Sequence, residues 1–352
     1  MVRNKIFYLG LVLMLLVLPS CKRAHVVHVS GIISEDTSWT KNNLYVVDSN
    51  VFVEATLTIE AGTIIKIAKK DGAPIGQPFI VSPTDGNIQA IGTATSHITF
   101  TSYADDTKGG NTDGAKIAPA KGDWGQFFIS SPVESNFAYC DFLYGGFISG
   151  ASGNEDYPML IVVSSVPVTI DHCTFAHSQH AALNVSGAKD TSTVTNNIFY
   201  DTSHPVWMSP NFSIDGSNTF HNPDDSTEGN DYNGIWLPNS SAITENRSWG
   251  NNGVPYVFDQ GFSVSQDVVL TVEAGTVVKF SLPGYGVDLT GGAAQIANLD
   301  SAFFTSIKDD VHGGDTNMDG TATTPAAGDW EGIYSNALYD YVTSGGILYA
   351  AN

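Results

Sequence analysis

The segment "GGDTNMDG", residues 313–320, places three oxygen-bearing side chains at alternate positions before a glycine. This D-x-[DN]-x-[DN]-G spacing is typical of calcium-binding loops, and two more carboxylates lie just upstream. The candidate ligands are Asp309, Asp310, Asp315, Asn317 and Asp319. An EF-hand would need a glutamate where this chain has Ala326, so we expect a calcium loop that projects from β-structure. Asp, Asn and Gly also form sharp turns for backbone reasons alone, and this alternative stays open.

A shorter acidic turn, "GGNTDG", occupies residues 109–114, about 200 residues earlier. When the glycines are aligned, two positions of the later loop are missing, including the equivalent of Asp315. The remaining candidate ligands are Asp105, Asp106, Asn111 and Asp113. The pattern therefore favours calcium at the later loop and leaves the earlier one between a weaker metal site and a plain corner.

Two other polar clusters carry weaker signals. "HSQH" places His177 and His180 three residues apart, close enough for a zinc pair, but the sequence specifies no third ligand. A turn that faces solvent is the favoured interpretation. The stretch "PDDSTEGNDYNG", residues 223–234, has four carboxylates without regular ligand spacing and is typical of a solvated loop.

Candidate ligand contacts outside these clusters are two tryptophans and an aspartate. Trp207 and Trp236 lie outside the duplicated motifs described below, so they are candidates for stacking on a sugar. Asp171 could share a groove with Asp201 of the next repeat, and a glycoside hydrolase needs two such carboxylates. Stacked strands bring carboxylates together in any case, so we assign no catalytic residue.

The elements that position these residues come from a duplication. "TLTIEAGTIIKI", residues 56–67, returns as "VLTVEAGTVVKF", residues 269–280, and "GDW" occurs with both Trp124 and Trp330. In each copy the acidic turn lies between these two motifs. We therefore expect the two turns to project from equivalent places, and we expect both GDW tryptophans to be structural.

A shorter period lies inside the duplicated block. A Cys or Asn, any residue and a Phe recur in "CDF", "CTF", "NIF" and "NTF", with the phenylalanines 33, 24 and 21 residues apart. The flanks alternate apolar and polar residues, as strands do. Coils of this length must stack to bury their apolar sides, with the phenylalanines in one interior column and the Cys or Asn residues in a second. A β-sandwich would have regular strands, but it would not explain why the same side chains recur in each coil.

The segments "TLTIEAGTIIK", "GTATSHITFTS" and "GDWGQFFI" together resemble the repeats of right-handed parallel β-helix proteins that bacteria secrete or anchor to lipid. The resemblance covers nearly all of the chain after its first 20 residues. It implies an all-β solenoid in which each coil contributes three short strands to three parallel sheets, with loop insertions between them. Some proteins of this fold are polysaccharide lyases or hydrolases, so the resemblance does not decide between binding and catalysis.

The N-terminus indicates export. Two basic residues precede an apolar run of 13 residues, which is too short to span a bilayer, and "LPSC" then resembles a lipobox ending at Cys21. We expect a signal peptide at 1–20, acylation of Cys21, a tether at 21–38 and β-helix blocks at 39–248 and 249–352. The second block stops halfway through its copy, and a truncated C-terminus is our expectation.

The net charge of the chain and its few arginines limit the classes of ligand it can bind. Loss of Arg3 and Lys5 with the signal would change the formal net charge from −21 to −23, which excludes nucleic acid as a partner. Only Arg23 and Arg247 would remain as arginines, which disfavours uronate lyases and polyanionic glycans. We expect a calcium-stabilised outer-membrane lipoprotein that acts as a non-catalytic adhesion or glycan-binding rod, with a polysaccharide hydrolase as the alternative. Which side of the membrane it faces is left open.

Overall fold

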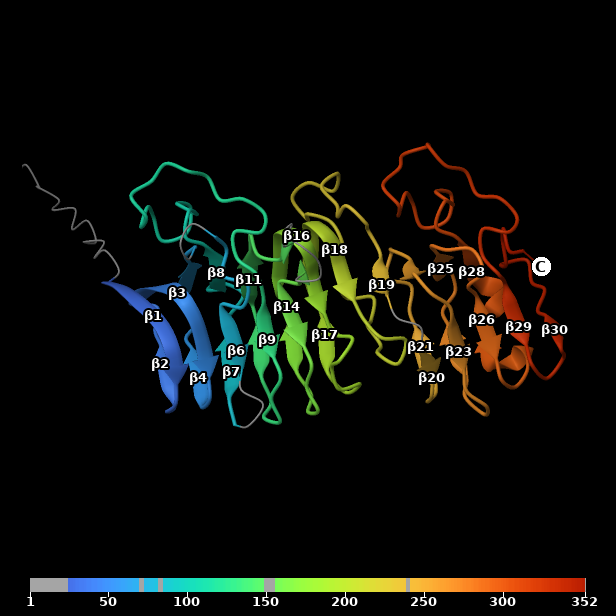
Figure 1. Ribbon diagram of the computed structural model, residues 1–352, viewed down its shortest axis with the longest axis horizontal. Helices are drawn as coiled ribbons and strands as arrows, with labels where there is room; N and C mark the ends of the chain where they lie inside the picture. Colours follow the sequence, from blue (N-terminus) through green and yellow to red (C-terminus); the bar gives the residue numbers. More distant parts are fainter. Residues whose placement is uncertain (1–24, 70–72, 82–84, 149–155, 239–240, 352) are drawn as a thin grey trace, which may run out of the picture.

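The computed structural model describes residues 25–69, 73–81, 85–148, 156–238 and 241–351, which form one elongated stack of β-coils (Figure 1). Ladders between the named strands are parallel, except those of β12 with β13 and β29 with β30. Both the all-β class and the solenoid are therefore confirmed. No helix in the described ranges is long and apolar enough to cross a membrane.

The largest sheet has 14 strands, because long strands turn a corner and join two faces of the coil. For example, one half of β3 pairs with β5 and the other half with β6. The members of this sheet are β1 (His25–Ile33), β3 (Asn43–Val53), β5 (Ile64–Ile67), β6 (Phe79–Val81), β8 (Ile98–Ser102), β9 (Phe127–Ile129), β11 (Cys140–Leu143), β14 (Leu160–Val162), β16 (Thr174–Asn184), β18 (Ile198–Trp207), β19 (Ile235–Leu237), β22 (Tyr256–Phe258), β25 (Val277–Phe280) and β28 (Phe303–Ser306).

Smaller sheets complete the coils. A six-stranded sheet contains β2 (Thr37–Trp39), β4 (Thr56–Ile59), β7 (Asn87–Ile91), β10 (Asn136–Ala138), β15 (Thr169–Asp171) and β17 (Thr193–Thr195). In the second block its counterpart contains β21 (Arg247–Trp249), β24 (Leu270–Val272) and β27 (Ile296–Ala297). A five-stranded sheet contains β20 (Ala242–Ile243), β23 (Phe262–Val264), β26 (Val287–Leu289), β29 (Ile333–Ser335) and β30 (Asp340–Tyr341). The remaining elements are the hairpin β12 (Phe147–Ile148) and β13 (Asp156–Tyr157) and the 3-10 turns η1 (Ala293–Gln295) and η2 (Leu299–Ser301).

The predicted phenylalanine column fills the interior. Phe142, Phe175, Phe199 and Phe220 stack in consecutive coils, with ring centroids 4.9, 5.2 and 5.6 Å apart. All four side chains are buried. Burial removes each ring from water, and stacking on the next ring adds to this gain in free energy. The column therefore stabilises the packing of each coil on the next.

The second predicted column runs along a corner. Asn197 is fully buried, and its side chain accepts a hydrogen bond from the Cys173 amide (2.8 Å) and donates to the Ile170 carbonyl (2.9 Å) and the Asn218 side chain (3.1 Å). The amide side chains thus satisfy corner backbone groups that no strand can pair. Cys140 and Cys173 occupy the column in the preceding coils as buried free thiols, not as a disulfide.

The duplication extends to the hydrogen bonds. Trp124 and Trp330 are fully buried, and their indole N–H groups donate to the equivalent carbonyls of Leu143 and Leu348. The segments around residues 105–120 and 309–325 project from the same side of the rod, with the segment 221–234 between them (Figure 1). The two acidic turns therefore lie at equivalent places, as the repeat predicts.

The solenoid begins earlier than the sequence indicates. Within the expected tether of residues 21–38, β1 pairs in parallel with β3 and β2 pairs with β4. Most of that segment is therefore part of the first coil, because the strands at 43–53 and 56–59 give it a template for pairing. The predicted signal peptide and Cys21 lie outside the described residues.

Candidate functional site

The later acidic loop contains three buried oxygens that accept no hydrogen bond within the described residues: Asp310 Oδ1, Asn317 Oδ1 and Asp319 Oδ1. Burial raises the pKa of Asp310, and the nearby charge of Asp315 raises it further. A hydrogen bond from Thr323 instead lowers the pKa of Asp319. Unpaired carboxylate and amide oxygens of this kind are what a calcium ion requires, so these three residues fit calcium.

The other two predicted ligands of this loop are already used by protein donors. The Asp315 carboxylate accepts hydrogen bonds from the amides of Asp319 (3.2 Å) and Gly320 (2.8 Å), which close the turn. Asp309 is fully buried and accepts from Thr305, from His312 and from backbone amides. Both carboxylates therefore shape the loop, which matches the turn alternative for these two positions.

The earlier loop is closed by its own hydrogen bonds. Asn111 Oδ1 accepts from the Gly114 amide (2.8 Å), Asp113 Oδ1 accepts from the Ala115 amide (2.8 Å), and the Asn111 amide donates to Asp106 (3.0 Å). Asp105 accepts from Thr101 and Thr107, as Asp309 does from its own neighbours. Across residues 105–117, which are all described, none of the four predicted ligands has an unpaired buried oxygen. Calcium fits the later loop better than the earlier one.

A buried lysine lies beneath each acidic loop, and neither lysine was predicted from the sequence to have a role. Lys66 Nζ donates to the Gly110 carbonyl and Lys279 Nζ to the Gly314 carbonyl, each at 2.6 Å. Desolvation lowers the pKa of Lys279 to about 8, although the aspartates above it oppose the shift. The equivalence of these lysines in "GTIIK" and "GTVVK" was the available signal. Their side chains alternate with the core residues Ile65, Ile67, Val278 and Phe280, so the ammonium groups point outward and neutralise part of the acidic charge from beneath the loops.

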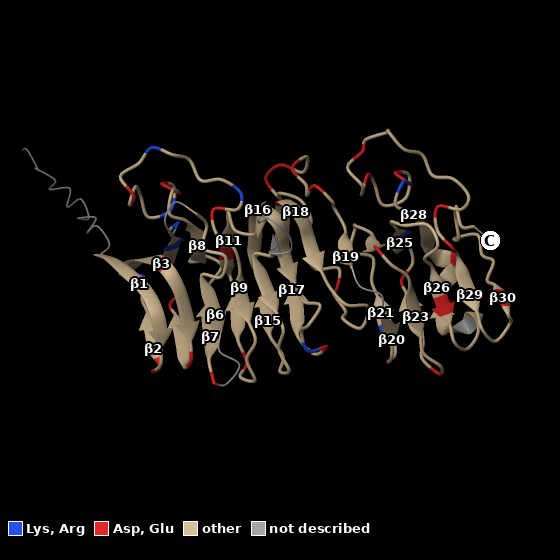
Figure 2. Ribbon diagram, in the orientation of Figure 1, with Lys and Arg blue, Asp and Glu red and all other residues tan. Residues whose placement is uncertain are grey.

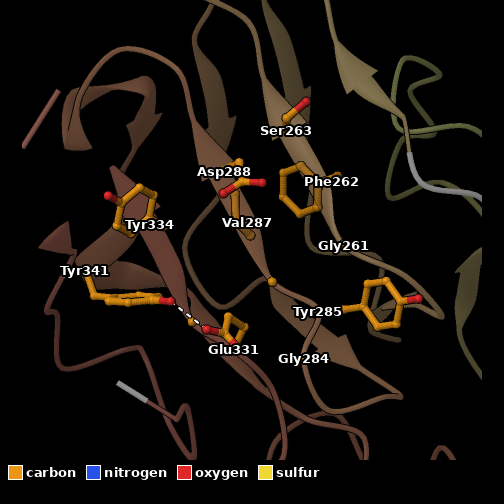
Figure 3. A pocket seen from close by; sticks show the side chains of 12 residues that line it. Gly261, Phe262, Ser263, Gly284, Tyr285, Val287, Asp288, Glu331, Tyr334 and Tyr341 are labelled. Atoms are coloured by element: carbon orange, nitrogen blue, oxygen red, sulfur yellow. Dashed lines mark hydrogen bonds between the residues drawn. The ribbon is translucent and has the colours of Figure 1, made fainter. Parts of the chain in front are cut away.

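A hollow of about 440 Å³ lies on the five-stranded sheet, and we call it the tyrosine trough (Figure 3). Ser263, Asp288 and Tyr334 occupy one register across β23, β26 and β29, and their side chains alternate with buried neighbours. A row of outward-facing polar side chains thus runs along the rod axis. The trough is lined by Gly261, Phe262, Ser263, Gly284, Tyr285, Gly286, Val287, Asp288, Glu331, Gly332, Tyr334 and Tyr341.

Aromatic rings stand at both sides of this hollow. Tyr334 and Tyr341 meet edge to face, with centroids 5.2 Å apart, and Tyr341 Oη donates to Glu331 Oε1 at 2.6 Å. Tyr285, which is 40% exposed, lies on the opposite side in Figure 3. Tyrosines offer an apolar face together with a polar tip, and the carboxylates of Asp288 and Glu331 add hydrogen-bond acceptors. This arrangement suits a ligand that has both hydroxyl groups and apolar faces.

Glycines make the trough possible. A Cβ on Gly261 would lie 2.3 Å from the Gly286 carbonyl oxygen, and one on Gly286 would lie 2.2 Å from that of Gly332. Those same carbonyls accept hydrogen bonds from the amides of Phe262 and Val287 in the adjacent coil. Close stacking of coils therefore requires glycine here, and Gly261, Gly286 and Gly332 contribute only backbone atoms to the lining of the trough.

Comparisons with known families agree with this architecture. The family model described as a pectate-lyase-like β-helix domain matches residues 31–153, and the model described as a right-handed β-helix region matches residues 139–302. The chain is a right-handed parallel β-helix protein. No curated protein and no solved structure matches it significantly. The β-helix assignment therefore rests on the two family models and on the sheet topology.

Within the β-helix, Trp207 and Trp236 are paired in register on β18 and β19. Trp236 is only 6% exposed, and its indole N–H donates to the Tyr232 carbonyl at 3.1 Å. Trp207 is half-buried and packs edge-on against His180, with centroids 4.8 Å apart. Little of the Trp236 ring is left for a sugar, and Trp207 keeps the larger free surface of the two.

Asp171 lies at the corner that precedes β16 and is held by its neighbours. Its carboxylate accepts from Thr195 (2.8 Å) and Asn196 (3.0 Å) and contacts His172 Nδ1 at 2.8 Å. Burial opposes ionisation, but these hydrogen bonds outweigh it and lower the pKa of Asp171. Asp201 is held by different partners, Lys121 and His177, at 2.7 Å each.

Proposed function

We propose that this β-helix is a lipid-anchored rod of the bacterial envelope that binds neutral glycans through the tyrosine trough, without catalysis. The observation that carries the proposal is the row of Ser263, Asp288 and Tyr334 beside two further tyrosines in one hollow. Aromatic rings can cover the apolar faces of sugars while hydroxyl and carboxylate groups bind their hydroxyls. The row follows the rod axis, so an extended glycan could contact several coils.

The charge of the protein selects the class of glycan. The whole chain has a formal net charge of −21, and Figure 2 shows acidic residues on the projecting loops and on β26. The trough contains Asp288 and Glu331 and no lysine or arginine among its lining residues. Uronates and sulfated sugars would be repelled, because no cation is present to neutralise them. Neutral hexose polymers fit this surface best.

Calcium is proposed as a structural ion of the later acidic loop. Asp310, Asn317 and Asp319 would hold it, because each has a buried oxygen that the protein leaves unpaired. An ion that binds only the folded loop stabilises that loop by mass action. Its role is to order a projecting segment, and the trough on the five-stranded sheet does not require it.

Lipid anchoring is proposed from the sequence alone. Acylation of Cys21 would place the rod on a membrane surface, and two or three acyl chains hold a protein stably where one does not. We propose the outer membrane as the location. Radiolabelled fatty acid should be incorporated into the native chain and not into a Cys21→Ala variant. Equal labelling of both would exclude this anchor.

A glycan array tests the proposed binding. The protein should bind neutral polysaccharides more strongly than uronates, and a Tyr334→Ala variant should lose most of the signal. Reducing ends should be assayed on every bound polymer. Steady release of reducing ends that Glu331→Gln abolishes would instead favour the hydrolase, since Asp288 and Glu331 face the same hollow. Array binding that Tyr334→Ala does not change would exclude the trough as the binding site.

A further inference from the structure

A group of three metal-ligating side chains lies on the loop side of the rod, apart from the trough and beside a hollow that Asp105 of the earlier acidic segment also lines. His177 Nδ1 is 2.7 Å from Asp201 Oδ2 of the next coil. Glu228 reaches the same place from the segment that precedes β19. Each of the three offers one ligand atom, and these atoms all lie within 4.8 Å of one another. The sequence indicated His177 as one half of a zinc pair without a third ligand, and the structure supplies two carboxylates from elsewhere.

The expected histidine partner is not part of this group. His180 is 6% exposed and packs edge-on against Trp207 on the other side of the local turn. Residues 177 and 180 therefore point to different surroundings. Glu228 comes from the stretch 223–234, in which the sequence indicated only a solvated loop. Folding brings it to His177 because Asn222 Nδ2 donates to Glu228 Oε2 at 2.6 Å.

We propose that His177, Asp201 and Glu228 bind one divalent transition-metal ion of the zinc class. One imidazole and two carboxylates form a mixed nitrogen and oxygen ligand set, which zinc, cobalt and nickel accept and which calcium and magnesium do not prefer. The three residues come from two consecutive coils and a loop. The bound ion would fasten the segment 222–231 to the face of the β-helix.

The surroundings give the ion access and hold the imidazole in place. A hollow of about 360 Å³ is lined by His177, Tyr144, Tyr200 and Asn222, among other residues, so solvent and further ligands can reach the imidazole. The Tyr144 ring stacks on the His177 imidazole, with centroids 4.8 Å apart and planes 15° from parallel. A ring that is fixed by packing loses less rotamer freedom when it binds an ion.

One neighbour opposes metal binding. Lys121 Nζ lies 2.7 Å from Asp201 Oδ1, the oxygen that His177 does not contact. Its charge cancels part of the negative charge that attracts the ion, and because the pair is partly exposed the effect is moderate. Replacement of Lys121 by a neutral side chain should therefore tighten binding. Tighter metal binding is an increase in affinity, which a misfolded variant could not mimic.

The chain contains a matched control in His172. Like His177, this residue has a positive φ (52° and 59°, respectively), stacks on a tyrosine of the preceding coil and contacts an aspartate at 2.8 Å. The described residues place no third ligand beside it. A substitution of His172 thus removes an equivalent ring, stacking contact and carboxylate contact without affecting the proposed site.

Titration of the purified, chelator-treated protein with cobalt(II), in saturating calcium, tests the proposal. One cobalt should bind per chain with visible absorption bands, and zinc should displace it. His177→Ala should weaken binding about 100-fold and Glu228→Gln about tenfold, while Lys121→Met should tighten it about fivefold. His172→Ala should leave binding unchanged. Circular dichroism would confirm the folding of each variant. Cobalt binding that is equal in wild type, His177→Ala and Glu228→Gln, or binding absent from both wild type and Lys121→Met, would overturn the proposal.

Discussion

Calcium should stabilise the protein through the later acidic loop and not through the earlier one. The perturbation is Asp310→Asn, which keeps the shape of the side chain but removes the charge beside an unpaired oxygen. Asp106→Asn is the matched control, because Asp106 occupies the equivalent position and is already hydrogen-bonded by Asn111. Both variants change the net charge by one unit, so non-specific electrostatics affect them alike.

The expected magnitude follows from mass action. Calcium at about 100 times its Kd would add about 2.7 kcal/mol to the free energy of unfolding. If the loss of one carboxylate weakens binding about tenfold, the same calcium concentration adds only about 1.4 kcal/mol to Asp310→Asn. For a chain of this size, wild type should gain about 4 °C in Tm and the variant about half as much.

Without calcium, Asp310→Asn should not lower the stability of the protein. Burial and the charge of Asp315 raise the pKa of Asp310, so its ionised form is disfavoured in the folded state. A neutral asparagine should therefore be no less stable than wild type in chelator. Scanning calorimetry with chelator, calcium and magnesium would measure both effects. Equal calcium shifts in wild type and Asp310→Asn, or a shift lost only in Asp106→Asn, would refute the assignment to the later loop.

Three further predictions concern side chains that are buried or partly buried. Lys279→Met removes the ammonium group that binds the Gly314 carbonyl and the Thr316 hydroxyl and that offsets the acidic charge of the loop. It should lower the free energy of unfolding by about 3 kcal/mol, measured with urea in the absence of calcium. An unchanged urea midpoint would contradict this role. Burial lowers the pKa of His204 to about 4, below its value in the unfolded chain. Between pH 6.5 and 4 the unfolded chain therefore binds more protons than the folded chain, so stability falls as the pH falls through that window. Between pH 7 and 5 the loss from this group should be about 2 kcal/mol by urea unfolding, and His204→Gln should not show it. Asn197→Ala removes the hydrogen bonds of the corner column and should cost about 3 kcal/mol, whereas substitution of the exposed neighbour Asn196 should cost less; thermal unfolding compares the two.

The parts of the fold that repeat could be predicted from the sequence. Phe142, Phe175 and Phe199 occupy one register because each coil must place the same side chain at the same corner, and this spacing is visible as a period. The buried GDW tryptophans could be predicted for the same reason. The first coil was mistaken for a tether, since β1 and β2 precede the longest repeated segment, and the weaker repeat of "ISEDTSW", residues 33–39, as "ITENRSW", residues 243–249, was not used.

The candidate sites were less predictable because they depend on contacts between coils. Ser263, Asp288 and Tyr334 are separated by 25 and 46 residues, and only the strand register places them side by side. His177 and Glu228 also lie far apart in the sequence, and an irregular insertion that follows no repeat brings them together. The acidic loops differ again: their ligand spacing could be read directly, but which oxygens stay unpaired depends on hydrogen bonds that the sequence does not specify.

Calorimetric titration with the neutral oligosaccharide that binds best on the array would show whether the tyrosine trough is the glycan site. Wild type should bind saturably, Tyr334→Ala should weaken binding at least tenfold, and Tyr334→Phe should lose less because the ring remains. Phe128→Ala, at the equivalent register on β9 in the first block, should have no effect. If Tyr334→Ala and Phe128→Ala bind as wild type does, the tyrosine trough is not the glycan site and the account is wrong.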